Sequence, residues 1–237
     1  MTKIGVYDSG VGGLTTLRIL ERKFPFCDFY YLADNKNMPF GSKDEAELKE
    51  IVSKAVKKLK AHSEIQVLAC NTASNFCEQK DVIKLSPPTT DDGKTLIMAT
   101  PQTQRRLKES GAYGESRYSF ANTCELASLV EVYVSVGARK NCLNMKELTP
   151  YLASKLFEFK GVQKIVLGCS HYLYLKNEIS RILGAVEYLD GNGSVVSALE
   201  KCVEKSENSG KVEFDFTADD ESAKYQKIYA LLKTTRE

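Results

Sequence analysis

Residues 164–171, KIVLGCSH, set the architecture, because they place a thiol and an imidazole directly after a short apolar run. A stretch of the same plan, IQVLACNT, occurs at residues 65–72. Short apolar runs bounded by polar residues predict buried strands, so Cys70 and Cys169 are expected where two strands end. Ligands of open α/β sheets bind at the carboxyl ends of the strands.

The rest of the chain alternates short apolar runs with longer amphipathic segments, which predicts an α/β fold with mostly parallel sheets. A weaker similarity between residues 4–9 and 96–101 supports two similar halves. The proline-rich loop at residues 86–94 is the expected domain boundary. Strands are predicted at residues 4–7, 29–32, 65–69, 96–99, 118–121 and 165–167, and helices at 14–23, 45–61, 126–136 and 148–159.

Composition favours a small-molecule partner. The chain has 237 residues, 33 basic against 31 acidic, so it lacks the basic surface of nucleic-acid binders. It has no apolar run of about 18 residues, and MTKIGVYDSG at the amino terminus lacks a leader, so we expect a cytoplasmic protein with no membrane partner. Seven cysteines without C-x-x-C spacing predict free thiols, and two histidines without a recognised ligand spacing favour no metal site.

Two thiols at opposed strand ends could act as a matched acid and base. Inverting the α-carbon of an amino acid requires one group to remove a proton from one face and another to return one to the opposite face. Cysteine, with an ordinary pKa of about 8.5, can serve in both roles when its surroundings tune it. The alternative is that each cysteine is an inert buried residue, which is common for a single strand-end cysteine.

A glycine-rich turn, DSGVGG at residues 8–13, follows the first predicted strand. Its glycines allow close approach of a ligand, and the helix after it favours an anion. The dinucleotide spacing G-x-G-x-x-G is absent, which disfavours a nucleotide-binding enzyme and favours a small anion such as a carboxylate. Asp8 could orient an ammonium group, assist a thiol or cap the helix.

Together these motifs resemble the glutamate racemases of the aspartate/glutamate racemase superfamily. The joint signal is strong because the motifs occur in the family's order and span most of the chain. They are DSGVGG at 8–13, Asp34 with Pro39-Phe40-Gly41, ACNTAS at 69–74, Ala99-Thr100-Pro101 with Thr103, Leu129-Val130-Glu131, and GCSHY at 168–172.

The resemblance implies a cofactor-independent enzyme that interconverts L- and D-glutamate and supplies D-glutamate for peptidoglycan. It implies two pseudo-symmetric parallel-sheet α/β domains with the active site in the cleft between them, and a homodimer. It also implies that the chain returns to the first domain after the second cysteine. The expected domains are residues 1–93 plus 187–237, with Cys70, and residues 94–186, with Cys169.

The resemblance also assigns site residues. Cys70 and Cys169 correspond to the catalytic thiols, Asp8 and His171 to their acid/base helpers, and Glu131 to a further active-site carboxylate. The positions that correspond to substrate contacts are Ser9, Pro39, Phe40, Gly41, Asn71, Thr72 and Ser170.

The chain departs from the family pattern in several places. Phe40 stands where tyrosine is usual, Ser170 where threonine is usual and Ala33 where glycine is usual, and residues 124–128 lack the usual prolines. About a dozen residues are missing between Cys70 and Thr100, enough to remove a strand and part of a crossover. A racemase for another acidic amino acid such as aspartate, and a divergent non-catalytic ligand-binding homologue, remain as alternatives.

Overall fold

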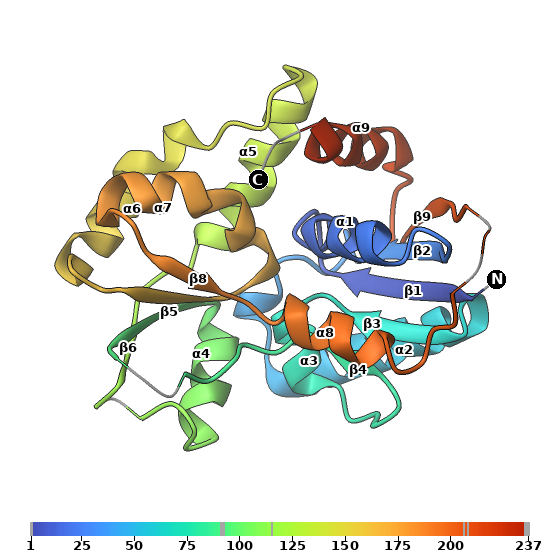
Figure 1. Cartoon of the computed structure of the whole chain (residues 1–237), viewed down its shortest axis with the longest axis horizontal. Helices are drawn as coiled ribbons and strands as arrows, with labels where there is room; N and C mark the ends of the chain where they lie inside the picture. The colour runs from blue at the N-terminus through green and yellow to red at the C-terminus, as the bar shows by residue number, and fades with distance from the viewer. Residues whose placement is uncertain (1, 91–92, 115, 206, 208, 235–237) are drawn as a thin grey trace.

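The computed structural model describes residues 2–90, 93–114, 116–205, 207 and 209–234, which form two parallel sheets side by side (Figure 1). The first sheet has the order β4-β3-β1-β2-β9 and the second β6-β5-β7-β8. The strands of the first sheet are β1 Lys3–Asp8, β2 Asp28–Ala33, β3 Ile65–Leu68, β4 Ile83–Lys84 and β9 Val212–Phe216. Those of the second are β5 Thr95–Ala99, β6 Tyr118–Phe120, β7 Lys164–Gly168 and β8 Glu187–Leu189. The predicted α/β class is confirmed.

Helices cover both faces of the first sheet because successive side chains of its buried strands point to opposite faces. In β2, Phe29 and Tyr31 pack with α1 and α9, whereas Tyr30 and Leu32 pack with α2 and α3. The helices are α1 Gly13–Lys23, α2 Glu45–His62, α3 Asn71–Phe76, α8 Asn192–Leu199 and α9 Ser222–Thr234, with the 3-10 turn η1 Phe40–Ser42.

The second sheet is covered in the same way. Leu96 and Met98 of β5 pack toward α5, α6 and α7, and Ile97 and Ala99 pack toward α4. The predicted helix at 148–159 is shorter in the structure, because its last three residues tighten into a 3-10 turn. Pro150 lies in its first turn, where proline is compatible with a helix. The helices are α4 Pro101–Glu109, α5 Leu126–Arg139, α6 Thr149–Leu156 and α7 Lys176–Leu183, with the 3-10 segments η2 Lys146–Leu148, η3 Phe157–Phe159 and η4 Ser170–Leu175.

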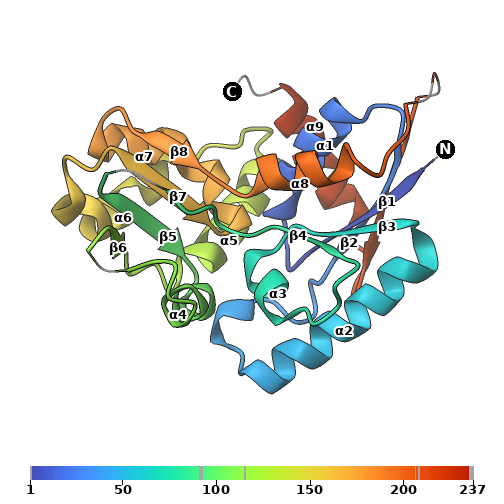
Figure 2. The ribbon, with the colours of Figure 1, turned by 60° about the horizontal axis from the view of Figure 1, so that its bottom comes forward.

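The chain passes between the sheets twice. The segment after β4 leads to β5, and Asp91 and Asp92 of the predicted loop lie outside the described residues. The return begins later than the predicted residue 187, because β8 at Glu187–Leu189 still pairs with β7. In the return segment, α8 packs on α1 and β4 of the first half (Figure 2), β9 pairs with β2, and α9 contacts both α1 and α5.

The shortened segment between Cys70 and Thr100 still completes an edge of the first sheet. β4 is only two residues long and pairs in parallel with β3 through Val67–Ile83 and Leu68–Lys84. α3, of six residues, begins directly after Cys70. Cys70 therefore keeps a buried place at the end of a paired strand despite the missing residues.

Within the described residues, no helix combines the length and apolar character that a membrane crossing requires.

Candidate active site

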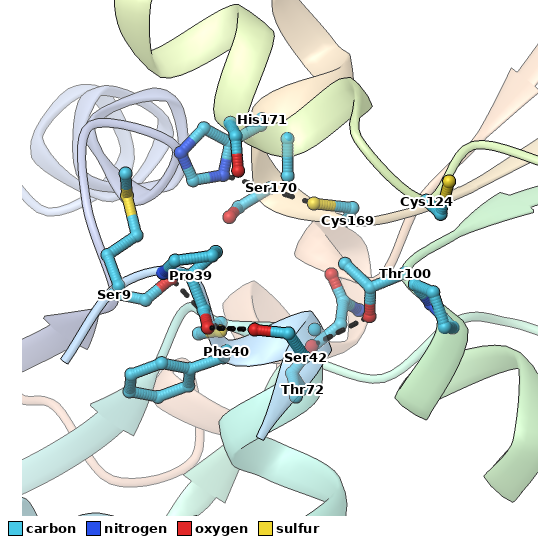
Figure 3. Close-up of a pocket in the computed structure, with 17 residues that line it drawn as sticks. Ser9, Pro39, Phe40, Ser42, Thr72, Thr100, Cys124, Cys169, Ser170 and His171 are labelled. Atoms are coloured by element: carbon cyan, nitrogen blue, oxygen red, sulfur yellow. Dashed lines mark hydrogen bonds between the residues drawn. The ribbon is translucent and has the colours of Figure 1, made fainter.

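A cavity of about 240 Å³ lies where the carboxyl ends of the two sheets face each other (Figure 3). Of the twelve residues that the sequence singles out, ten line it, and Asp8 and Glu131 lie behind them. Parallel strands end at the same edge of their sheet, which explains how residues far apart in the chain meet here. The ten are Ser9, Pro39, Phe40, Gly41, Cys70, Asn71, Thr72, Cys169, Ser170 and His171.

Cys70 reaches the cavity from the first sheet, between β3 and α3. Its side chain is 6% exposed, and its Sγ lies 3.7 Å from the Oγ of Ser9. Burial, with the negative charge of Asp8 as the second cause, raises the pKa of the Cys70 thiol to about 12. Cys70 is therefore a protonated thiol.

Asp8 ends β1 and is fully buried behind Cys70 and Ser9. Its carboxylate accepts hydrogen bonds from the Gly10 N–H at 2.9 Å and from the Ser170 hydroxyl, on the other half, at 2.8 Å. Burial raises the pKa of Asp8, while the charge of His171 and these hydrogen bonds act in the opposite direction. Asp8 therefore links the two halves rather than facing the cavity.

Cys169 reaches the cavity from the second sheet, between β7 and η4. Its Sγ lies 3.9 Å from Nδ1 of His171, whose Nε2 lies 2.9 Å from Oε2 of Glu131. Burial alone would lower the pKa of His171, but the hydrogen bonds with Cys169 and Glu131 outweigh it and raise that pKa well above its ordinary value. His171 is therefore an imidazolium, with one N–H directed at Glu131 and the other at Cys169.

Glu131 projects from α5 and holds this imidazolium. Burial opposes its ionisation, but the hydrogen bond and charge of His171 and the N–H of Val11 keep the pKa of Glu131 below its ordinary value. The Val11 N–H donates to the same Oε2 at 2.8 Å. Glu131 and His171 thus form a buried ion pair at the junction of the two halves.

The glycines of the DSGVGG turn serve this junction rather than a ligand, since only Ser9 of the turn lines the cavity. A Cβ on Gly10 would collide with Glu131, and one on Gly12 would collide with Ser170 and His171. Close packing of the turn against the second half therefore requires glycine at these two positions.

Asn71 and Thr72 begin α3 at the cavity wall. The Nδ2 of Asn71 lies 3.5 Å from the Leu85 carbonyl, and its buried Oδ1 finds no hydrogen-bond partner among the described residues. The Thr72 hydroxyl lies 2.9 Å from that of Thr100 and 3.3 Å from that of Thr103. These groups offer one free acceptor and a cluster of hydroxyls to a ligand.

The wall that contains Pro39, Phe40 and Gly41 is held from behind by Asp34. This buried carboxylate accepts hydrogen bonds from Tyr7 at 2.7 Å, Asn37 at 2.9 Å and Thr217 at 2.5 Å. Asp34 therefore joins β1, β2 and the segment after β9 to the loop that forms this wall.

Seven further residues line the cavity that the sequence did not assign to the site. Thr100 and Pro101 belong to a motif noted in the sequence, so their strand-end position was a usable signal, whereas the others carry no comparable pattern. Cys124 is an exposed third thiol, just beyond β6. The seven are Met38, Ser42, Thr100, Pro101, Cys124, Ala127 and Ser128.

In the part of the chain that the structure describes, no group of three or more His, Cys, Asp or Glu side chains is placed to hold a metal ion.

The sequence is similar to known glutamate racemases over most of its length. The chain is 34% identical over 207 residues to the glutamate racemase of Clostridium novyi, which covers 80% of this chain and 78% of that relative. It is 29% identical to the glutamate racemase of Halothermothrix orenii, over 98% of this chain and 99% of the relative. No family model matches the chain.

Solved structures share the fold. Glutamate racemase isoform RacE1 from Bacillus anthracis superposes with a TM-score of 0.79 at 23% identity, covering 99% of this chain and 95% of that one. The Francisella tularensis enzyme in complex with D-glutamate gives 0.76 at 21% identity, covering 100% and 95%. With this fold and with a relative 34% identical over most of both chains, the protein belongs to the glutamate racemase family.

Proposed function

We propose that this protein interconverts L- and D-glutamate by proton transfer between two thiols, without a cofactor. The observation that carries the proposal is the placement of Cys70 and Cys169 on one cavity, each at a strand end of a different sheet. Opposed acid and base groups are what inversion at an α-carbon requires.

In the proposed first step, the thiolate of Cys169 removes the α-proton of the enantiomer that presents it on that side. The imidazolium of His171 stabilises the negative charge on this sulfur, and Glu131 keeps the imidazole protonated. The product of the step is a Cys169 thiol and a planar carbanion whose charge is shared with the substrate carboxylate.

In the second step, the Cys70 thiol donates its proton to the opposite face of the carbanion. The raised pKa of Cys70 supports this donor role in the free enzyme. The step leaves a Cys70 thiolate and a Cys169 thiol, so the two sulfurs have exchanged protonation states. Turnover of the opposite enantiomer, or exchange with water, restores the starting state.

Neutral groups at the cavity wall are proposed to hold the substrate. The free Oδ1 of Asn71 suits the α-ammonium group, and the hydroxyls of Ser9, Thr72 and Thr100 suit carboxylate oxygens. Pro39, Phe40 and Gly41 form the wall against the carbon chain of the substrate.

Incubation with L-glutamate in D₂O tests the proposal. The expected result is D-glutamate that carries deuterium at the α-carbon, detected by NMR and chiral chromatography, and no turnover by the Cys70→Ala/Cys169→Ala double variant. Bound but unlabelled glutamate would instead indicate a non-catalytic ligand-binding protein. Faster labelling of aspartate than of glutamate would assign a different acidic substrate.

We also propose the cellular setting. D-glutamate from this reaction would supply peptidoglycan synthesis, in line with the function of the family. Seven free cysteines, two of them with a proposed catalytic role, suit a reducing compartment such as the cytoplasm. The two sheets are proposed as two domains, residues 1–93 with the return segment from about residue 190, and the part between them.

A homodimer is proposed for the assembled protein. Two large apolar side chains on the second half, Val132 of α5 and Phe157 of η3, are 57% and 65% exposed. Burial of such side chains against a second copy is a common way to stabilise a dimer. Light scattering of the purified chain measures the mass, and a monomer at micromolar concentration would contradict this assignment.

A further inference from the structure

The backbone of Val11, in the glycine-rich turn, is held by two side chains from the other half of the molecule. Its N–H donates to Oε2 of Glu131 at 2.8 Å, and its carbonyl accepts from the Tyr174 hydroxyl at 3.0 Å. Tyr31, from β2, donates to the neighbouring Gly10 carbonyl at 2.7 Å. The turn is therefore anchored to its own sheet by one tyrosine and to the second half by another.

Tyr174 and His171 lie on the same short segment, η4, three residues apart. Oε2 of Glu131 accepts hydrogen bonds both from the Val11 N–H and from Nε2 of His171. The backbone of Val11 thus connects the Tyr174 hydroxyl to the carboxylate that pairs with the imidazole. A shift of Val11 would move the hydrogen bond that fixes Glu131.

We propose that Tyr174 is a positioning residue, which holds the Val11 backbone so that Glu131 stays paired with His171 beside Cys169. The kinetic part of this inference rests on the proposed racemase function, and the geometric part does not. Tyr174 does not line the cavity among the described residues, so its effect on catalysis passes through Val11 and Glu131.

Several titratable groups face His171 from the elements packed around it. They are Cys169, directly before the segment of His171, Glu131 from α5 and Asp8 from β1, and Lys224 of α9 acts on Glu131. Only the contact with Glu131 depends on the Val11 backbone directly. Loosening Val11 should therefore reduce the stabilisation of the imidazolium by Glu131 and leave the other three groups in place.

Tyr174→Phe tests the inference because it removes a single oxygen atom. The Val11 carbonyl keeps a hydrogen bond from the Leu14 N–H at 3.2 Å, so the variant leaves no unsatisfied buried acceptor. Tyr172→Phe is the matched control. Tyr172 lies on the same segment and donates to the Thr123 carbonyl at 3.0 Å, within the second half.

The direct measurement is the NMR titration of ¹⁵N-labelled imidazole, which is simple because the chain has two histidines. Exposed His62 serves as an internal reference. We expect Tyr174→Phe to lower the titration midpoint of His171, to leave that of His62 unchanged and to reduce kcat by about fivefold. Tyr172→Phe should leave both midpoints unchanged.

A double-variant cycle separates action through Glu131 from a general loosening of the fold. Glu131→Gln alone should lower the His171 midpoint further than Tyr174→Phe does, and adding Tyr174→Phe to it should cause no further change. The same His171 midpoint in Tyr174→Phe and wild type, or equal changes in the two tyrosine variants, would overturn the inference. If Tyr174→Phe lowers the His171 midpoint but the wild-type protein has no racemase activity, the proposed function is refuted and the positioning role is upheld.

Discussion

Cys70 and Cys169 end equivalent strands, but their surroundings carry opposite charge. Behind Cys70 lies the carboxylate of Asp8, and beside Cys169 lies the imidazolium of His171. Similar strand ends therefore give one sulfur that keeps its proton and one that faces a cation. A racemase needs such a difference at the start of each turnover, because one thiol must donate while the other accepts.

Removing the cation should have the largest effect of the substitutions around the two thiols. His171→Asn takes the positive charge away from Cys169, and we expect kcat to fall about a hundredfold or more with a smaller change in KM. Steady-state racemisation measured by circular dichroism gives both constants. His62→Asn, at an exposed position that stacks on Tyr30, is the control and should retain full activity. Near-normal kcat in His171→Asn would remove the basis of the charge comparison.

The ion pair behind Cys169 should also stabilise the fold. Glu131→Gln leaves the buried imidazolium without its counter-charge, and we expect the free energy of unfolding to fall by about 3 kcal/mol near pH 6. Urea denaturation at several pH values measures this loss. A loss below about 0.5 kcal/mol would show that the pair is solvated rather than buried.

The pH dependence of this fall in the free energy of unfolding follows from the pKa shifts of Glu131 and His171. The lowered pKa of Glu131 gives stability that is present above the ordinary glutamate pKa of about 4.3 and lost toward acid. The raised pKa of His171 gives stability that is complete below about 6.5 and lost as pH rises through the value in the folded protein. The difference between wild type and Glu131→Gln should therefore be largest from about pH 4.3 to 6.5 and shrink at alkaline pH. A difference that grows with pH would contradict the assignment of charge.

The Cys70 side depends on a loop held by Asp34. In Asp34→Asn, an amide replaces the carboxylate that accepts hydrogen bonds from Tyr7, Asn37 and Thr217. The wall at residues 39–41 should therefore loosen. We expect KM for glutamate to rise about tenfold, with kcat less affected, because the proposed role of the loop is to contact the substrate rather than the reacting proton. Asp81→Asn, in an exposed ion pair with Lys60, is the control. A loss confined to kcat would place Asp34 in the proton-transfer steps instead.

Substitution of the third thiol of the cavity, Cys124, should have the smallest effect on activity. Cys124 is exposed and comes from the loop after β6 rather than from a strand end of matching sequence. We expect Cys124→Ser to change kcat/KM by less than about twofold. A large loss would show that exposure at the cavity wall does not separate an inert thiol from the proposed catalytic pair.

The positions of the two thiols were predictable because each follows an apolar run whose pattern specifies a buried strand. Asp8 and Ser9 follow a third such run. Other features depended on contacts that local patterns do not encode. The role of Asp34 depends on a hydrogen bond from Thr217, about 180 positions along the chain, which no local pattern predicts.

Two further features were predicted inaccurately from the sequence: the helix at residues 148–159 and the domain boundary at residue 187. A periodic apolar pattern predicts one helix to residue 159, but α6 ends at Leu156 and the last three residues form a 3-10 turn. β8 is a three-residue strand of partly exposed side chains, so its pairing with β7 leaves little trace in its sequence. Glu131 was expected only through the family resemblance, since a carboxylate on an apolar helix does not by itself specify a partner.

The most direct test of the two-sided account follows the single variants Cys70→Ala and Cys169→Ala in D₂O with each enantiomer of glutamate separately. The account predicts that neither variant inverts glutamate, that each exchanges the α-proton of only one enantiomer, and that the two variants select opposite enantiomers. Inversion by either variant, or exchange of the same enantiomer by both, would contradict it.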